Sequence, residues 1–297
     1  MELVKTREGR VDLVTGLSPL ETLPVSQSAF ATVVKTRGNL SSVFGLFNTR
    51  KAASPWGDVR LRQAANLAVN RADVIRYAAR GNGVTIPALI PARGLGHDPA
   101  LPPYPFDPGK ARQLLRDAGF PDGLPISLIA TDDLKVQATV IGKMLEQGGF
   151  KVALQMLTAV AFNQKTALVH LDQPAEQQAW DIALTSLGDV DNFPVFSFYH
   201  WFALDGPSDW VMESPELRRL YEETLRTVDR DKQIALTKQL ERLTRDQAYF
   251  LFLYNPVGLA AVNKAVSFVP YPNGVLLLAE TSVTDQHWSV RPGPRTP

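Results

Sequence analysis

The sequence of 297 residues has no cysteine, no long apolar run and no excess of charge of either sign. The lack of cysteine excludes disulfides, thiolate zinc sites and cysteine nucleophiles, although it leaves the compartment open. No apolar run approaches the roughly 18 residues that a membrane-spanning helix needs. The 31 Lys and Arg residues are balanced by 30 Asp and Glu residues, without a basic run. We therefore expect no nucleic-acid partner.

Recognisable catalytic motifs are also missing. The four histidines are scattered along the chain, and none lies in an HExxH motif or beside a GxSxG motif. The segment "GNGVTI" at Gly81 lacks the third glycine of a dinucleotide-binding fingerprint. The aspartates near residue 190 do not form an EF-hand, because Pro194 and His200 stand where that loop needs Gly and Glu. We predict a protein that is not an enzyme and that uses no metal and no cofactor.

The residues that are present indicate an α/β protein with room for two lobes, since 45% of them are hydrophobic. Residues 10–17, 30–38 and 41–49 are β-rich runs, typical of strands at the edge of an α/β lobe. From Asp58 to Ala79 the apolar positions follow helical spacing and predict two consecutive helices. Further helices are expected at residues 134–147, 214–228 and 231–246, with strands at 126–130, 150–157 and 181–187 and a β-rich end.

A proline-rich segment and a strongly capped helix separate these parts. Residues 81–107 contain six prolines and four glycines, too many for regular structure, and are apolar enough to predict an ordered loop laid over a surface. Asp107 is then a good N-cap, Pro108 suits the first helical position, and Gly119 suits the turn that ends the helix.

Four segments, in this order, resemble the second half of bacterial extracellular solute-binding proteins of the oligopeptide and dipeptide-binding family. They are "LFNTRKAASPWGDVRLRQAANLAVNRADVIRYAARGNG", "IPALIP", "YPFDPGKARQLLRDAGFPDG" and "DKQIALTKQLERLTRDQAYFLFLY". The resemblance implies a periplasmic-binding-protein-like lobe with a mixed sheet and flanking helices, plus part of a second lobe. We expect a partial first lobe in residues 1–50, a complete ligand-binding lobe in 51–247 and return strands in 248–297, with hinge crossings near 47–50 and 252–256.

The same resemblance implies a function. It indicates the solute-binding component of an ABC importer, periplasmic or extracellular, which binds an oligopeptide or oligosaccharide between two lobes and docks on a membrane permease. Family members carry an export signal and a further N-terminal half, and we expect this chain, which shows no signal peptide, to be a fragment that lacks that half. Two alternatives stay open: the ligand-sensing lobe of a transcription regulator whose DNA-binding N-terminus is absent, and an isolated lobe that binds proteins.

The segment "LGDVDNFPVFSFYHWF", residues 187–202, follows a predicted strand, where open α/β sheets place ligand sites. In peptide-binding relatives the corresponding segment contains an aspartate that pairs with the peptide amino group, and the resemblance gives this role to Asp189 or Asp191. A second interpretation is equally open, because Asp189, Asp191 and Asn192 are also residue types that cap and turn a chain.

Aromatic residues crowd between 193 and 210, where they serve as pocket wall or as core. Most are assigned to the core, while Trp201 and Trp210 flank a polar turn and are the preferred exceptions. The candidate ligand-contact residues are Asp189, Asp191, Asn192, Phe193, Trp201 and Trp210. No arginine occurs between Arg116 and Arg218, which weakens the case for a short peptide held by its carboxylate and favours longer peptides or neutral sugars.

Overall fold

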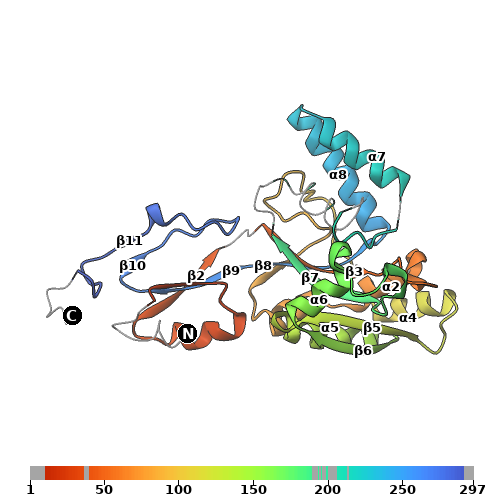
Figure 1. Ribbon diagram of the computed structural model, residues 1–297, viewed down its shortest axis with the longest axis horizontal. Helices are drawn as coiled ribbons and strands as arrows, with labels where there is room; N and C mark the ends of the chain where they lie inside the picture. The colour runs from red at the N-terminus through yellow and green to blue at the C-terminus, as the bar shows by residue number, and fades with distance from the viewer. Residues whose placement is uncertain are drawn as a thin grey trace. The chain divides into compact units, whose positions relative to one another are not determined.

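The computed structural model describes residues 11–36, 40–188, 193, 195, 199, 206–212 and 214–290, and the chain divides into two compact units. Unit 1 comprises residues 1–39 and 257–297, and unit 2 comprises residues 40–256 (Figure 1). The sequence analysis placed these boundaries near residues 50 and 247 instead. They differ because two strands, at 41–47 and 250–256, belong to the sheet of unit 2. The interpretation of the units as lobes stays a prediction.

Unit 2 is built on a six-stranded mixed sheet with the strand order β4-β8-β3-β7-β5-β6. β5 pairs in parallel with β6 and β7, whereas β3 runs antiparallel to both of its neighbours, β7 and β8. The predicted α/β class with a mixed sheet is confirmed. The strands are β3 (Ser41–Phe47), β4 (Gly83–Thr85), β5 (Leu124–Thr131), β6 (Phe150–Leu157), β7 (Ile182–Gly188) and β8 (Phe250–Pro256).

β3 lies in the interior of this sheet, whereas the sequence analysis placed its residues among strands at the edge of an α/β lobe. Val43 and Phe47 enter the core on one face, whereas Phe44 and Leu46 enter the core on the other. A strand that is covered on both faces needs apolar residues throughout, so its sequence loses the alternation that marks an exposed face.

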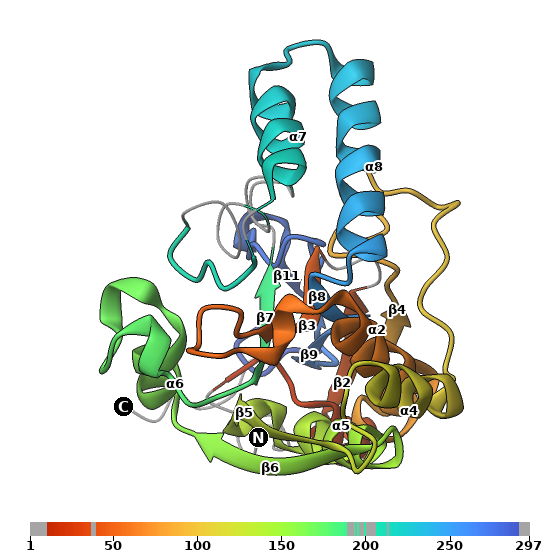
Figure 2. The same ribbon diagram turned by 90° about the vertical axis from the view of Figure 1, so that its right-hand side faces the viewer.

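Seven helices of unit 2 lie within its described residues, and α7 and α8 project away from the sheet as a hairpin (Figure 2). On one face, α2, α4 and α5 bury their apolar residues against β3 and β5. On the other face, the proline-rich segment and the bases of α7 and α8 form a second core with Phe250 and Phe252 of β8. The helices are α2 (Val59–Ala68), α3 (Arg71–Asp73, continued by a π turn at Val74–Ala78), α4 (Pro108–Asp117), α5 (Lys135–Gln147), α6 (Ala159–Thr166), α7 (Pro215–Arg226) and α8 (Arg230–Asp246).

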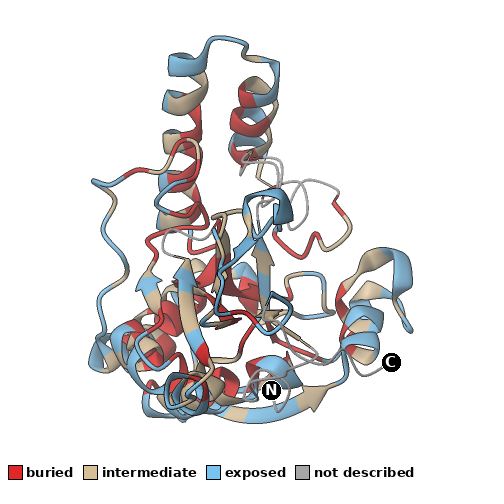
Figure 3. Ribbon diagram, turned by 90° about the vertical axis from the view of Figure 1, so that its left-hand side faces the viewer, coloured by how far each residue is buried: buried red, intermediate tan, exposed pale blue. Residues whose placement is uncertain are grey.

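The helix ends follow the expected local rules. The side chain of Asp107 accepts the backbone N–H of Lys110 at 2.8 Å, and Gly119 takes a φ of +95°, so the predicted cap and stop of α4 are both confirmed. α7 and α8 form a helical hairpin whose tip is exposed (Figure 3), with Val228 almost fully in solvent. No helix within the described residues is long and apolar enough to cross a membrane.

Unit 1 is smaller and mostly β. Its three-stranded sheet has the order β1-β9-β2, a separate pair joins β10 to β11, and α1 packs beside β2. Leu17, Val25, Ala31, Leu259 and Ala261 form its core. The elements are β1 (Leu13–Thr15), α1 (Thr22–Ser26), β2 (Ala31–Thr36), β9 (Gly258–Asn263), β10 (Val266–Ser267) and β11 (Ser282–Val283).

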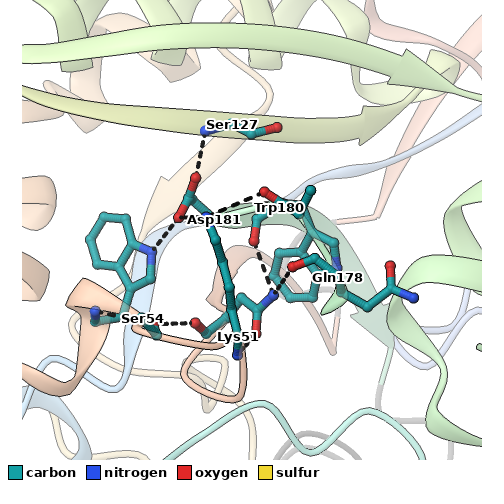
Figure 4. Close-up of polar contacts among 9 residues, drawn as sticks. Lys51, Ser54, Ser127, Gln178, Trp180 and Asp181 are labelled. Atoms are coloured by element: carbon teal, nitrogen blue, oxygen red, sulfur yellow. Dashed lines mark hydrogen bonds and ion pairs between the residues drawn. The ribbon is translucent and has the colours of Figure 1, made fainter. Parts of the chain in front are cut away.

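A buried carboxylate, Asp181, joins three parts of unit 2 at the start of β7 (Figure 4). It accepts the backbone N–H of Ser127 at 2.8 Å, the indole N–H of Trp56 at 3.3 Å and the ammonium of Lys51 at 3.0 Å. The loop after β3, the turn before α2 and the middle of β5 are therefore attached to one side chain.

Asn48 holds the same loop from the other side. Its amide donates to the carbonyls of Gln178 and Trp180 at 3.1 and 3.0 Å, and its own carbonyl accepts the hydroxyl of Ser54 at 2.6 Å. These contacts fix the loop after β3 to the residues that precede β7, so the network has a structural role.

Two glycines between α4 and β5 differ in how closely the chain packs around them. Gly119 and Gly123 have similar φ angles, +95° and +94°, but a Cβ at Gly119 would meet nothing within 4 Å, whereas one at Gly123 would lie 2.6 Å from the carbonyl oxygen of Gly149. We expect Gly119→Ala to cost about 1–2 kcal/mol from backbone strain alone. Gly123→Ala should cost about 1–2 kcal/mol more because of the clash. Urea denaturation of both variants measures the difference, and equal losses would contradict it.

Candidate functional site

One edge of the unit 2 sheet gathers the carboxyl ends of its parallel strands. β5 and β6 end together, since Thr131 pairs with Leu157, and β7 ends at Gly188, which pairs with Ser41 at the start of β3. β8 ends at the same edge, because it also runs antiparallel to β3. Ligands of open α/β sheets bind outside the carboxyl ends of the strands, so this edge is the candidate site.

A small polar cluster fixes the middle of this edge. The hydroxyl of Ser42 donates to the carbonyl of Leu89 at 2.7 Å and accepts the amide N–H of Asn255 at 2.7 Å. The same amide of Asn255 donates to the carbonyl of Ser41 at 2.9 Å. Ser42 and Asn255 are buried, so the cluster positions β3, β8 and the proline-rich segment relative to one another.

The proline-rich segment is embedded in the second core of unit 2. Ile86, Ala88, Leu89 and Ile90 are all buried there, which confirms the prediction of an ordered segment. It is not wholly irregular, because β4 at its start pairs with β8. The depth of burial explains its composition: prolines leave few N–H groups to satisfy, and the apolar residues between them supply the contacts.

Beside this segment lies a buried acid that the sequence did not reveal as functional. Glu241 of α8 is 1% exposed, and its Oε2 accepts the backbone N–H of Ile90 at 3.0 Å. Its Oε1 accepts the hydroxyl of Tyr199. The one signal in the sequence is its position, since Glu241 lies on the helix face that also buries Thr237, Leu240 and Thr244.

The surroundings of Glu241 disfavour its charged form. Burial raises the pKa of Glu241 to about 7, against the hydrogen bonds from Tyr199, Ile90 and Leu89, which lower it. Burial, reinforced by the charge of Glu241, also raises the pKa of Tyr199 well above its usual value. Within the described residues no Lys, Arg or His forms an ion pair with Glu241. The contact of Glu241 with Ile90 and Tyr199, called the junction below, therefore holds an acid whose pKa lies near neutral pH.

The predicted ligand-contact residues fall into two groups. Asp189, Asp191, Asn192 and Trp201 lie outside the described residues, and their role stays a prediction. Phe193 is half-buried. Trp210 is fully buried and donates its indole N–H to the carbonyl of Thr166 at 2.7 Å. Its ring packs edge-to-face against Trp180, with the ring centroids 4.7 Å apart. A direct ligand contact by Trp210 would therefore need its ring to become exposed.

An arginine that the sequence analysis did not single out approaches this segment from elsewhere in the chain. Arg50, which follows β3, contacts the carboxylate of Asp209 at 2.7 Å and the carbonyl of Asp209 at 2.5 Å. Its guanidinium is thus already engaged by a side chain of the segment that follows β7. Among the described residues, no group of three or more His, Asp or Glu side chains could hold a metal ion.

Comparisons with known proteins point to one family. A model of the family described as "Bacterial extracellular solute-binding proteins, family 5 Middle" matches residues 3–209. The chain is 28% identical over 226 residues to the dipeptide-binding protein of Escherichia coli, with 74% of this chain and 41% of that protein covered. It is 26% identical over 286 residues to heme-binding protein A of Haemophilus influenzae, with 91% of this chain and 49% of that protein covered.

A solved structure has the same fold. It is that of the ABC transporter-associated periplasmic binding protein DppA from Helicobacter pylori in complex with the peptide STSA, which matches with a TM-score of 0.76 and 21% identity over 91% of this chain and 51% of that one. This match confirms the predicted periplasmic-binding-protein fold. The chain spans about half the length of the relatives it matches.

Proposed function

Because the chain belongs to the bacterial extracellular solute-binding proteins of family 5, we propose that it is part of the solute-binding component of an ABC importer and that it binds peptides. The observation that carries the proposal is the family match over residues 3–209, which includes the whole carboxyl edge of β5, β6 and β7. The peptide-binding relatives support a peptide as the ligand. The proposal includes a membrane permease as partner and a location outside the cytoplasmic membrane.

The comparisons give no support to the transcription-regulator alternative. The proposed role is binding without chemical turnover, as the names of the relatives suggest. We place the ligand at the carboxyl edge of the unit 2 sheet, beside the cluster of Ser42 and Asn255. Asp189 or Asp191, which directly follow β7, would accept the peptide ammonium group.

Calorimetric titration of the chain with the peptide STSA tests this function. We expect binding of STSA, weaker binding of the same peptide with an acetylated N-terminus, and no binding of maltotriose. Maltotriose stands for the neutral oligosaccharides that the sequence left open. If the chain bound maltotriose and did not bind STSA, the assignment of a peptide ligand would be contradicted.

The Asp189→Asn and Asp191→Asn variants test how the ammonium group is held. Loss of a charge-assisted hydrogen bond costs on the order of 1.5–3 kcal/mol, so one of the two variants should bind STSA about 10- to 150-fold more weakly. Asp122→Asn is the matched control, because Asp122 is exposed and lies before β5, at the opposite edge of the sheet. Unchanged affinity in both Asp189→Asn and Asp191→Asn would remove these carboxylates from the site.

A further inference from the structure

Glu241 is where three segments of unit 2 meet. α8 supplies the acid, the proline-rich segment supplies the N–H of Ile90, and the segment that follows β7 supplies the hydroxyl of Tyr199. The proline-rich segment is also tied to the candidate edge, because the carbonyl of Leu89 accepts the hydroxyl of Ser42. A change at Glu241 therefore acts on the proline-rich segment, which borders the proposed site.

The other charged and titratable groups around Glu241 do not neutralise it. Asp98 is a second acid near Glu241, and it pairs with Arg242 at 2.7 Å while Lys238 lies close enough to act on it. His97 contacts the carbonyl of Ile90 at 3.1 Å through Nδ1. Thus Arg242 is paired with Asp98, and Glu241 has only uncharged donors as hydrogen-bond partners in the described structure.

We propose that Glu241 is a proton-dependent clamp that, when protonated, holds Tyr199 and Ile90 on α8 and so positions the proline-rich segment for ligand binding. The link to ligand binding rests on the proposed function. A protonated Glu241 can still accept from Ile90 with one oxygen and can donate its own proton to the hydroxyl oxygen of Tyr199, which reverses the bond that Tyr199 makes to the carboxylate. The hydroxyl hydrogen of Tyr199 can then turn to the side chain of Thr244, so the junction carries no charge. An ionised Glu241 is a buried charge without a cation, and opening of the junction would let water solvate it.

The direction of the pH effect follows from linkage. The closed junction binds its proton with a pKa of about 7, whereas an opened, hydrated carboxyl would return toward the ordinary value of 4.5. Between these values the closed form holds one more proton than the open form, so closure weakens about tenfold per pH unit as the pH rises. Above about pH 7 both forms are ionised and the effect levels off.

Hydrogen exchange of the whole chain between pH 5 and 8 tests the clamp without any ligand. We expect the protection of the amides of Ile90, Val195 and Tyr199, corrected for intrinsic exchange rates, to fall about tenfold per pH unit up to pH 7. Glu241→Gln keeps a donor and an acceptor but does not titrate, so its protection should not depend on pH. His97 is unchanged in Glu241→Gln, so a slope that persists in this variant would belong to another group and would overturn the proposal.

Two tyrosine variants separate the clamp from general packing. Tyr199→Phe removes the hydroxyl that reaches Glu241 and should lower protection at every pH. Tyr221→Phe is the control, because Tyr221 lies in the same core and the described hydrogen bonds to Glu241 come from Ile90 and Tyr199, so this variant should keep the wild-type profile. A wild-type profile in Tyr199→Phe, or a flat profile in the wild-type chain, would overturn the clamp.

Titration with STSA at pH 5.5 and 7.0 tests the link to ligand binding. The wild-type chain should bind STSA more weakly at pH 7.0, whereas Glu241→Gln should bind it equally at both values. Equal pH dependence in the two proteins would contradict the positioning role. Absence of STSA binding at every pH would contradict the proposed function, and the exchange experiment would still decide on the clamp.

Discussion

Replacing Arg71 with alanine is expected to lower the free energy of unfolding by about 3–5 kcal/mol. Arg71 opens α3 and is 4% exposed, although no carboxylate pairs with it within the described residues. Burial lowers the pKa of Arg71 to about 10, which leaves the guanidinium charged at neutral pH. Its charge is stabilised by carbonyl dipoles instead of an anion.

These dipoles come from a helix and a strand that Arg71 joins. Nε donates to the carbonyl of Phe252 at 2.7 Å, and Nη1 donates to the carbonyls of Asn66 and Val69 at 3.0 and 3.1 Å. Nη2 donates to Oδ1 of Asn66, which also accepts the backbone N–H of Phe252. Alanine would leave these buried acceptors unpaired and open a cavity between α2 and β8.

Arg71→Lys and Arg76→Ala make the test specific. Lysine keeps the charge but cannot reach several acceptors at once as the forked guanidinium does. The free energy of unfolding of Arg71→Lys should therefore lie between those of the wild-type chain and of Arg71→Ala. Arg76 is exposed and its guanidinium lies over the ring of Tyr77 at 5.3 Å, so Arg76→Ala should cost less than about 1 kcal/mol. Urea denaturation, followed by the fluorescence of the buried Trp56, Trp180 and Trp210, measures all three variants. A loss in Arg71→Ala as small as that of Arg76→Ala would contradict the argument.

The sequence predicted what depends on neighbours along the chain. Asp107 and Gly119 bound α4 as expected, because caps and stops are set within one turn of the helix. The interior place of β3 was missed, since its apolar run fits either a buried strand or other buried structure. The link from Asn255 to Ser42 joins residues 213 apart, and only strand pairing brings them together.

The candidate site divides in the same way. The carboxyl end of β7 could be located from strand order and helix spacing, and the resemblance then indicated Asp189 and Asp191. Glu241 could not be chosen in advance, because its place on the buried face of α8 does not reveal which groups it contacts. Its partners Ile90 and Tyr199 lie in segments far from α8 in the sequence, and only the fold brings them to Glu241.

Removal of the Asp181 carboxylate should be as costly as removal of Arg71, because Asp181→Ala leaves three donors without their acceptor. The N–H of Ser127 lies inside β5, the indole N–H of Trp56 is fully buried, and Lys51 would lose its counter-charge. We expect a loss of about 3–5 kcal/mol in the free energy of unfolding.

Asp181→Asn is the sharper variant, because its size is almost unchanged. One amide oxygen can still accept from Ser127 or from Trp56, but the amide N–H would face the remaining donor, so a smaller loss than in Asp181→Ala is expected. Glu146→Gln is the matched control: the pair of Lys143 and Glu146, at 2.8 Å, is exposed, and such pairs contribute less than about 1 kcal/mol. If Asp181→Ala and Glu146→Gln lost equal stability in urea, the loop after β3 would be held by Asn48 and by apolar packing, and the buried carboxylate would contribute nothing beyond them.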